Sequence, residues 1–178
     1  MTISSDLKAK QHRDRLIEKA KEYQVGTYSR RFVAPLFQKM VRAESGADPR
    51  KFVTAVVDGT IRQVARKLGE CVCVTCGKVL AWDSGQLGMH TGHFVASRCN
   101  SIVYEETNTA CQCCSCNIFK HGNPGPFRTW MEAVRGLPEI ERLERLKADS
   151  RQFTRDELVD MRIGFGIRLK AAIERMAK

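Results

Sequence analysis

Two cysteine clusters constrain this chain more than any other feature of its sequence. Seven of its eight cysteines lie in the stretches CVCVTCG (71–77) and CQCCSCN (111–117). Each stretch contains C-x-x-C spacing, which puts two thiolates on one side of a tight turn and suits a tetrahedral zinc ion. A closed site of four thiolates has no open position, so we expect a structural zinc ion. The first stretch offers one pair and the second offers two overlapping pairs: Cys73–Cys76, and either Cys111–Cys114 or Cys113–Cys116.

The rest of the sequence is typical of a cytosolic protein. The first twenty residues are highly charged and lack an apolar signal core, and no run approaches the roughly 18 apolar residues of a membrane span. Clustered C-x-x-C pairs without a secretion signal indicate metal ligands in a reducing compartment rather than disulfides. We therefore expect a cytoplasmic protein without a membrane partner.

Positive charge flanks the cysteine-rich centre. The net charge is +10, of which residues 1–70 carry +7, residues 71–127 none and residues 128–178 +3. Such a distribution favours a polyanionic partner, and nucleic acid is the expected one. The three ranges also suggest a division into a basic helical N-terminal region for DNA contact or dimerisation, a cysteine-rich core and a helical C-terminal region.

Local patterns predict a mixed α+β fold that is mostly helical. Apolar spacing over 49–68, after the capping pair Asp48–Pro49, predicts a helix. Thr154-x-x-Glu157 is a capping-box pattern for a last helix. Two short strands are expected at 92–95 and 102–105. The remaining predicted helices cover 5–23, a segment from Ser29 or Ala34 to Glu44, a segment from Cys114–Cys116 to Gly122, 126–134 and 138–147.

Polar residues between and after the cysteine clusters follow a recognisable order. A histidine lies on the first expected strand, an asparagine follows the second, and another asparagine follows the last cysteine: His93, Asn108 and Asn117. This order resembles the His-Asn-His (HNH) nuclease superfamily, whose ββα-metal core is two strands and a helix around one divalent ion. In its zinc-stapled members, four residues separate the middle asparagine from the second C-x-x-C pair, which selects Cys113–Cys116.

A closer resemblance is to the NinG (Rap) family of lambda-type phage recombination endonucleases. Four motifs carry it: C-x-x-C-G at 73–77, G-H-F at 92–94, C-x-x-C-N-x-x-K-x-G-N at 113–123 and P-F-R at 126–128. The resemblance covers roughly residues 49–175 and gives residues 1–48 no counterpart. It implies a zinc-stapled HNH-like core within 71–127, flanked by N- and C-terminal helices.

The resemblance also implies site roles. His93 matches the general base, because a neutral imidazole can take a proton from water, and Asn108 matches the asparagine that orients the base. Asn117 matches a ligand of the catalytic ion, expected to be Mg²⁺ or Mn²⁺. Gly92 stands where the superfamily often has a second ligand, and glycine cannot serve. The NinG family usually has Asp three residues before the base, where this chain has His90, so His90 is the candidate for that role. Expected DNA contacts are Lys120, Arg128, Arg62, Arg66 and Lys67.

The expected function is therefore metal-dependent endonuclease activity on branched recombination intermediates such as D-loops and Holliday junctions. A phage-encoded protein acting in the bacterial cytoplasm is implied, as are a homodimer and contacts with recombination proteins of the phage or host. Two alternatives remain open. One is a non-catalytic zinc-stabilised DNA-binding module in which His93 is structural, and the other is a zinc-containing interaction protein that does not contact DNA.

Overall fold

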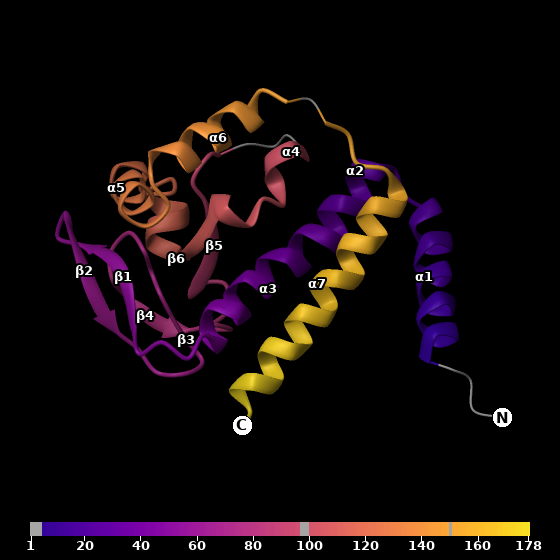
Figure 1. Cartoon of the computed structure of the whole chain (residues 1–178), viewed down its shortest axis with the longest axis horizontal. Coiled ribbons are helices and arrows are strands. Elements are labelled where there is room, and N and C mark those ends of the chain that lie inside the picture. Colours follow the sequence, from indigo (N-terminus) through magenta and orange to yellow (C-terminus); the bar gives the residue numbers. More distant parts are fainter. Residues whose placement is uncertain (1–4, 97–99, 150) are drawn as a thin grey trace.

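The computed structural model describes residues 5–96, 100–149 and 151–178 of the 178-residue chain. Over these ranges, helices are combined with three two-stranded antiparallel sheets, which confirms the predicted mixed α+β class. Figure 1 shows the strands and the helices α4–α6 on one side of α3, and α1 beyond α7 on the other. No helix in this described part of the chain is long and apolar enough to cross a bilayer.

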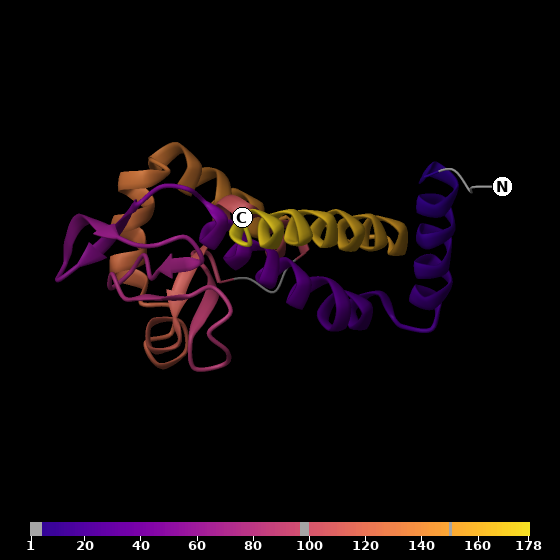
Figure 2. The same cartoon turned by 90° about the horizontal axis from the view of Figure 1, so that it is seen from below.

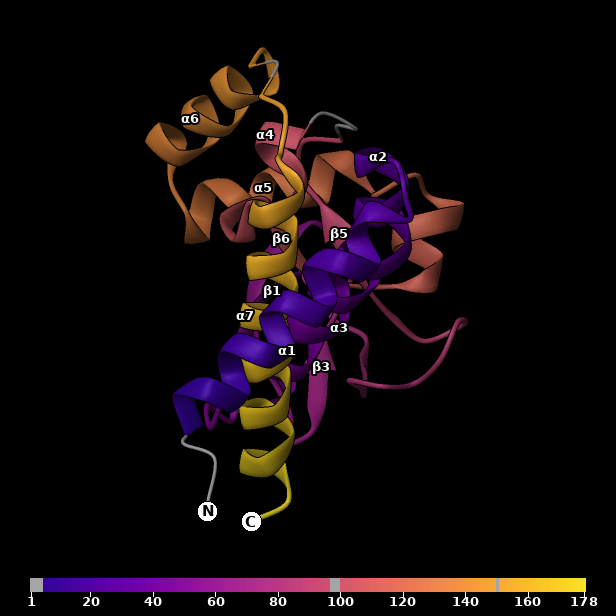
Figure 3. The same ribbon diagram turned by 90° about the vertical axis from the view of Figure 1, so that its right-hand side faces the viewer.

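Helices from the two ends of the chain pack together. α7 lies along α3 and also contacts α1, as the views in Figures 2 and 3 show. Apolar side chains of these helices form one buried cluster that includes Tyr28, Phe37 and Leu158. Pro35 lies in the first turn of α3, as its sequence predicts. The elements are α1 (Ser5–Lys21), α2 (Val25–Tyr28), the π-helical η1 (Ser29–Val33), α3 (Ala34–Ala47) and α7 (Arg155–Met176).

The predicted capping box of α7 is confirmed. Thr154 Oγ1 accepts a hydrogen bond from the backbone N–H of Glu157 (3.2 Å), and the Glu157 carboxylate accepts one from the Thr154 N–H (2.8 Å). These two bonds satisfy donors that the first turn of a helix otherwise leaves unpaired. Further along α7, Asp160 accepts a hydrogen bond from Arg13 Nε (2.7 Å), which ties α1 to α7.

The segment 49–68, predicted to be one helix, is instead largely a β-hairpin. β1 (Phe52–Val57) pairs antiparallel with β2 (Thr60–Ala65). Asp58 and Gly59 form the two-residue turn with φ values of 49° and 76°, and two consecutive left-handed residues give the turn that matches strand twist. The β-branched side chains of both strands favour this extended conformation. The apolar spacing that predicted a helix face therefore belongs to two paired strands.

The first predicted strand of the core is confirmed with earlier bounds, and the second is misplaced. β5 (Met89–His93) covers part of the expected 92–95. Its antiparallel partner is β6 (Thr109–Cys113), not 102–105. Ile102 lies in α4 (Asn100–Val103), where its side chain is fully buried, and the 3-10 turn η2 (Glu106–Asn108) leads into β6. The cysteine-bearing residues form the second strand because they pack against the first cluster.

The remaining elements surround the cysteine clusters. β3 (Glu70–Val72) and β4 (Val79–Ala81) pair, and the turn between them carries Cys73 and Cys76. After β6 follow the π-helical η3 (Ser115–Phe119), α5 (Pro124–Val134) and α6 (Leu137–Lys147), close to the predicted helices. Trp130 Nε1 donates to Thr54 O (2.8 Å), which joins α5 to the hairpin. This side of the molecule has its own apolar core, which includes Val56, Ile102, Phe127, Met131 and Leu143.

Candidate metal centre and active site

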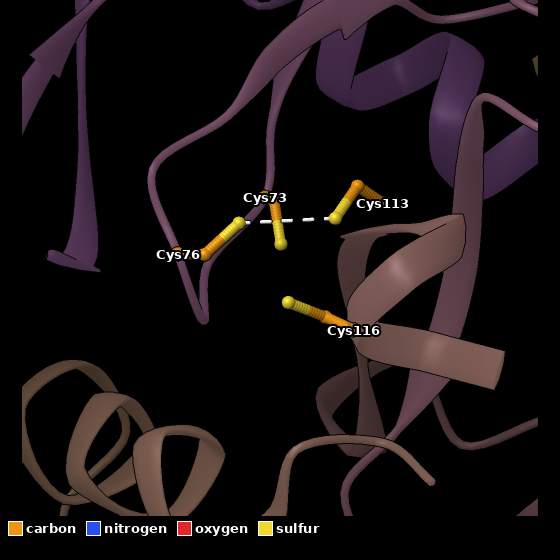
Figure 4. A group of neighbouring side chains, drawn as sticks. All are labelled: Cys73, Cys76, Cys113 and Cys116. Atoms are coloured by element: carbon orange, nitrogen blue, oxygen red, sulfur yellow. Dashed lines mark hydrogen bonds between the residues drawn. The ribbon is translucent and has the colours of Figure 1, made fainter. Parts of the chain in front are cut away.

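Four cysteine sulfurs converge where the two clusters meet, as Figure 4 shows. The Sγ atoms of Cys73, Cys76, Cys113 and Cys116 all lie within 4.8 Å of one another. Those of Cys76 and Cys113 are 3.7 Å apart. Four thiolates at the usual Zn–S distance of about 2.3 Å form a tetrahedron with edges of about 3.8 Å. The cluster therefore fits a structural zinc ion, and it selects Cys113–Cys116 over Cys111–Cys114.

Local sequence shapes the first half of this centre. The N–H groups of Cys76 and Gly77 both donate to Cys73 O (3.4 and 2.8 Å), which closes a tight turn. Gly77 has a φ of 74°, and a Cβ atom there would lie 2.5 Å from Val57 Cγ2. Glycine is required at this position by both its conformation and its space. The hairpin β1–β2 thus packs directly against the turn that presents two of the four thiols.

The second half of the centre lies at the junction of β6 and η3. Cys113 ends the strand and Cys116 lies one turn into the helix. Asn123 Nδ2 donates to Cys116 Sγ (3.7 Å) and to Thr75 O (3.2 Å), which links the two turns. Burial raises the pKa of the Cys76 thiol. A bound cation would counter this effect, because it stabilises thiolates over thiols.

The other cysteines of the clusters lie outside the four-sulfur group. Cys71 is fully buried, donates from Sγ to Arg42 O (3.2 Å) and lies in the same buried cluster as Cys111. Cys114 is also buried. Cys99, which the sequence predicts to be a small buried residue or a spectator, lies outside the described residues.

His90 and Asn117, the two predicted ligands of a catalytic ion, are in contact. His90 lies on β5 and Asn117 on η3, and His90 Nδ1 is 3.2 Å from Asn117 Nδ2. His90 Nε2 is 2.6 Å from Gln86 O. A carbonyl only accepts, so Nε2 carries the proton and the Nδ1 lone pair faces Asn117. Metal-binding histidines are typically held by such a bond, and turning the Asn117 amide over would place its oxygen beside Nδ1.

His93, the predicted general base, lies at the end of β5. Its Nε2 is 3.2 Å from Val103 O, so this nitrogen is the donor and Nδ1 keeps its lone pair. Burial lowers the pKa of His93, which keeps the imidazole neutral at pH 7, as a base requires. Side chains alternate along a strand, so His93 and His90, three residues apart, point to opposite faces of β5. The structure therefore brings His90 to Asn117 but does not bring His93 to that pair.

Asn108, the other predicted catalytic residue, fixes the chain after β5. Its side chain is fully buried. Its Oδ1 accepts from Val95 N (2.8 Å), and its Nδ2 donates to Val95 O (3.2 Å). Its own carbonyl accepts from Phe94 N (2.8 Å). Asn108 thereby holds the residues that follow His93, and it can influence that histidine only through this positioning.

A cavity of about 550 Å³ lies beside the His90–Asn117 pair. It is bounded by α3, the segment between β4 and β5, β5 itself and η3. It is lined by Lys39 and Arg42 of α3 and by Trp82, three residues that no sequence motif indicates. Residues three apart on a helix share a face, so the spacing of Lys39 and Arg42 is the signal that indicates a basic face. The position of Trp82 beside them has no local signal.

Comparison with protein families identifies the chain. The model for the bacteriophage lambda NinG protein matches residues 6–175. The chain belongs to the NinG family. No curated protein and no solved structure matches it.

The NinG match extends further than the resemblance predicts. It begins at residue 6 rather than near 49, so the N-terminal helices are part of the family unit. The packing of α1 and α3 against α7 agrees with this extent, because it joins the N-terminal helices to the C-terminal one. Motif-based comparison fails over 1–48 because these helices carry no cysteine, histidine pair or glycine turn that is diagnostic on its own.

Most of the predicted DNA contacts of this NinG-family protein lie at its surface. Lys120, Arg62 and Lys67 are exposed. Arg128 is half-exposed, with Nε 2.9 Å from Glu132 Oε1 and Nη1 3.6 Å from Glu144 Oε1. Those two carboxylates compete with a phosphate for the Arg128 guanidinium. Lys120, Arg62 and Lys67 are therefore the better candidates for DNA contact.

The prediction that Arg66 contacts DNA is wrong. Its side chain is 1% exposed. Its guanidinium donates to backbone carbonyls of the turns on either side of the hairpin, namely those of Ser45, Gly46, Asp48, Arg50 and Glu70. Arg66 therefore holds the end of α3 against the hairpin and β3, and no part of it is available to a phosphate.

Proposed function

We propose that this NinG-family protein is a structure-specific endonuclease that hydrolyses phosphodiester bonds in branched DNA recombination intermediates, such as D-loops and Holliday junctions. The observation that carries the proposal is the His90–Asn117 pair, with its oriented Nδ1, at the wall of a cavity that also contains Lys39 and Arg42. An imidazole and an amide oxygen suit a divalent metal ion, and the strand and helix that carry them adjoin the proposed zinc site. The positive side chains of Lys39 and Arg42 suit a phosphate.

In this proposal, the side chains of His90 and Asn117 would hold Mg²⁺ or Mn²⁺. The ion would supply positive charge beside the scissile phosphate, where negative charge develops as the bond breaks. We assign His93 Nδ1 as the acceptor of a proton from the attacking water, while its Nε2–H stays bonded to Val103 O. Because His93 ends β5 and points to the other face of this strand from His90, this role requires the attacking water to lie at the end of β5. Water adds to phosphorus, the P–O3′ bond breaks and the 3′ oxygen takes up a proton from solvent, which yields a 3′ hydroxyl and a 5′ phosphate. His93 returns its proton to solvent afterwards.

Recognition of a branch point suits the surface of this protein. Shape and phosphate position distinguish a junction from a linear duplex, so exposed basic side chains can recognise it without reading bases. Lys120, Arg62 and Lys67 are such side chains. A homodimer would present two sites to a symmetric junction, and we include this assembly in the proposal.

Histidine variants test the roles separately. His93→Ala should lower the cleavage rate of a four-way junction by roughly 10²–10⁴-fold, the usual contribution of a general base. His90→Ala should instead raise the Mg²⁺ or Mn²⁺ concentration that gives half-maximal cleavage. His12→Ala, in exposed α1, is the matched control and should cut as the wild type does. If folded His93→Ala and His90→Ala both cut like the wild type, the proposed site is wrong.

The second candidate is a non-catalytic zinc-stabilised DNA-binding module. The position of His93 favours it, because this side chain points away from the His90–Asn117 face and bonds a backbone carbonyl as a structural histidine does. Under this candidate, wild-type protein binds junctions with strong salt dependence and never cleaves them with any divalent ion.

A further inference from the structure

We propose that the cavity beside His90 and Asn117 receives one unpaired nucleotide of the DNA, with its base stacked on Trp82 and its phosphate bound by Lys39 and Arg42. This inference deepens the proposed nuclease function and rests on it, because it assigns a substrate subsite next to the proposed ion site. It would direct cleavage to the single-stranded segment at a branch rather than to duplex arms.

The size and position of the cavity suit such a ligand. Its volume of about 550 Å³ lies within the range of about 300–1,000 Å³ that is typical of small-molecule sites. A double helix is far too wide to enter a cavity of this size, whereas one nucleotide is not. The same cavity is lined by His90 and Asn117, so a nucleotide inside it would lie next to the phosphate held at the ion site.

Trp82 is fixed as one wall of the cavity. Helix α3 approaches it at Gly46, where an added Cβ would lie 3.0 Å from Trp82 Cβ. Arg42 Nε donates to Trp82 O (3.3 Å), which fixes the backbone of the same residue. The ring itself is only half-buried and contributes to the cavity surface. A braced aromatic ring in an open cavity suits base stacking, which binds single strands with little sequence preference.

Charge in the cavity favours a phosphate. Lys39 Nζ lies over the Trp82 ring, 5.9 Å from its centroid, so a base that stacks on this face would displace the ammonium towards the phosphate. Arg42 lines the same wall, and Asp83 is the one carboxylate among the described lining residues. Two cations beside an aromatic ring match a nucleotide, which offers one anionic group and one flat face. A paired base cannot use this site, because its faces are covered by neighbouring base pairs.

Exposed apolar side chains adjoin the cavity on two sides. Leu87 is 83% exposed and Phe119 is 71% exposed, the highest values for large apolar side chains in the described ranges. Leu87 follows Gln86, whose carbonyl bonds His90, and Phe119 follows Ile118, which lines the cavity. Exposed apolar side chains lower solubility and do not stabilise the fold. Contact with unstacked bases would account for the exposure of Leu87 and Phe119.

Binding without cleavage tests the inference. Fluorescence anisotropy would compare a labelled oligothymidylate with a duplex of equal length, with no added Mg²⁺ or Mn²⁺. Trp82→Leu should bind the oligothymidylate roughly 5- to 150-fold more weakly, as expected for one lost base stack. Lys39→Gln should lower the slope of log affinity against log salt by about 0.7, the value for one phosphate of a single strand. Lys10→Gln, in exposed α1, removes the same charge far from the cavity and should change neither quantity by as much.

A second measurement uses the wild-type chain, in case Trp82→Leu does not fold. An oligothymidylate carrying 5-iodouracil is photo-cross-linked, and the attached residue is identified by mass spectrometry. Cross-links to Trp82 or to its neighbours in the cavity support the inference, and cross-links confined to other surfaces overturn it. Equal affinity of wild type and folded Trp82→Leu also overturns it. Oligothymidylate binding in the cavity by a protein that never cleaves any branched DNA refutes the nuclease function instead.

Discussion

Replacing single cysteines tests the proposed zinc centre most finely, because its four expected ligands share two short clusters with three cysteines that are not ligands. Cys113→Ser removes a sulfur that lies 3.7 Å from that of Cys76 and is 3% exposed. Cys111→Ser is the matched control, since Cys111 lies on the same strand and is 4% exposed but is not one of the four converging cysteines. Both changes put a hydroxyl in place of a buried thiol, so their difference isolates the metal.

The expected effect is large. Structural zinc sites contribute on the order of 10 kcal/mol to folding, comparable with the entire net stability of about 5–15 kcal/mol of a typical domain. If Cys113→Ser loses about 4 kcal/mol of that contribution, its melting temperature should fall by roughly 8–16 °C. Its zinc content should fall well below one ion per chain, whereas Cys111→Ser should retain one.

The assay is zinc per chain by elemental analysis, together with thermal unfolding followed by circular dichroism. Equal zinc loss in Cys113→Ser and Cys111→Ser would refute the assignment of ligands. Full zinc retention in Cys113→Ser would refute it as well. Cys71→Ser is expected to keep its zinc, since Cys71 bonds Arg42 O rather than the sulfur group.

Three further predictions concern side chains that support the site. In urea titrations, Arg66→Lys should cost about 2–4 kcal/mol of unfolding free energy, because buried carbonyls lose their donors; Arg62→Lys, exposed on the strand that ends just before Arg66, should cost under about 0.5 kcal/mol. Asn108→Ala should lower the melting temperature and the cleavage rate together, while Asn108→Asp, which keeps an acceptor for the loop N–H, should lose less of both. A hydrogen bond from Arg142 lowers the pKa of Glu139 to about 2, so its contribution to stability is complete above about pH 4.5 and is lost as the pH falls towards 2; this contribution should be absent from the pH dependence of unfolding in Glu139→Gln.

The four cysteines that converge were predictable from sequence because the chemistry of a C-x-x-C pair is local. C-x-x-C spacing identifies the first pair, and the positions of Asn108 and Asn117 relative to the second cluster select Cys113 and Cys116. The structure confirms this selection through the four sulfurs. Cys71 is also predicted to be a bystander, on the argument that its spacing from Cys73 points its side chain away. Residues two apart on an extended chain in fact share a face, and the hydrogen bond from Cys71 Sγ to Arg42 O is what occupies this thiol.

The hairpin at 52–65 shows where periodicity misleads. Val53, Val56, Val57 and Val64 have spacings that fit both a helix face and two short strands. The deciding signals are the β-branched composition and Asp58–Gly59, a two-residue turn signature. The second core strand is different, since its residues 109–113 carry no alternating apolar pattern. They form a strand because their sulfurs and Gln112 are buried against other segments, which is a tertiary cause.

The candidate site was predictable only in part. His90 and Asn117 were expected to act together, and they are in contact. The orientation of His93 away from them depends on which residue begins β5, and strand boundaries are the least certain product of sequence analysis. The cavity is assembled from α3, the segment after β4, β5 and η3. No local pattern places Trp82 beside Lys39 and Arg42, because these residues meet only where α3 packs against the segment after β4.

A direct cleavage assay tests whether this NinG-family protein cuts branched DNA, as we propose. Purified zinc-containing protein is incubated with a D-loop, a four-way junction and a linear duplex of matched sequence, with Mg²⁺, with Mn²⁺ and without either ion. We expect ion-dependent nicks next to the branch that carry a 5′ phosphate, and little cutting of the linear duplex. Intact junctions under every ion condition, or equal cutting of linear and branched DNA, would contradict it.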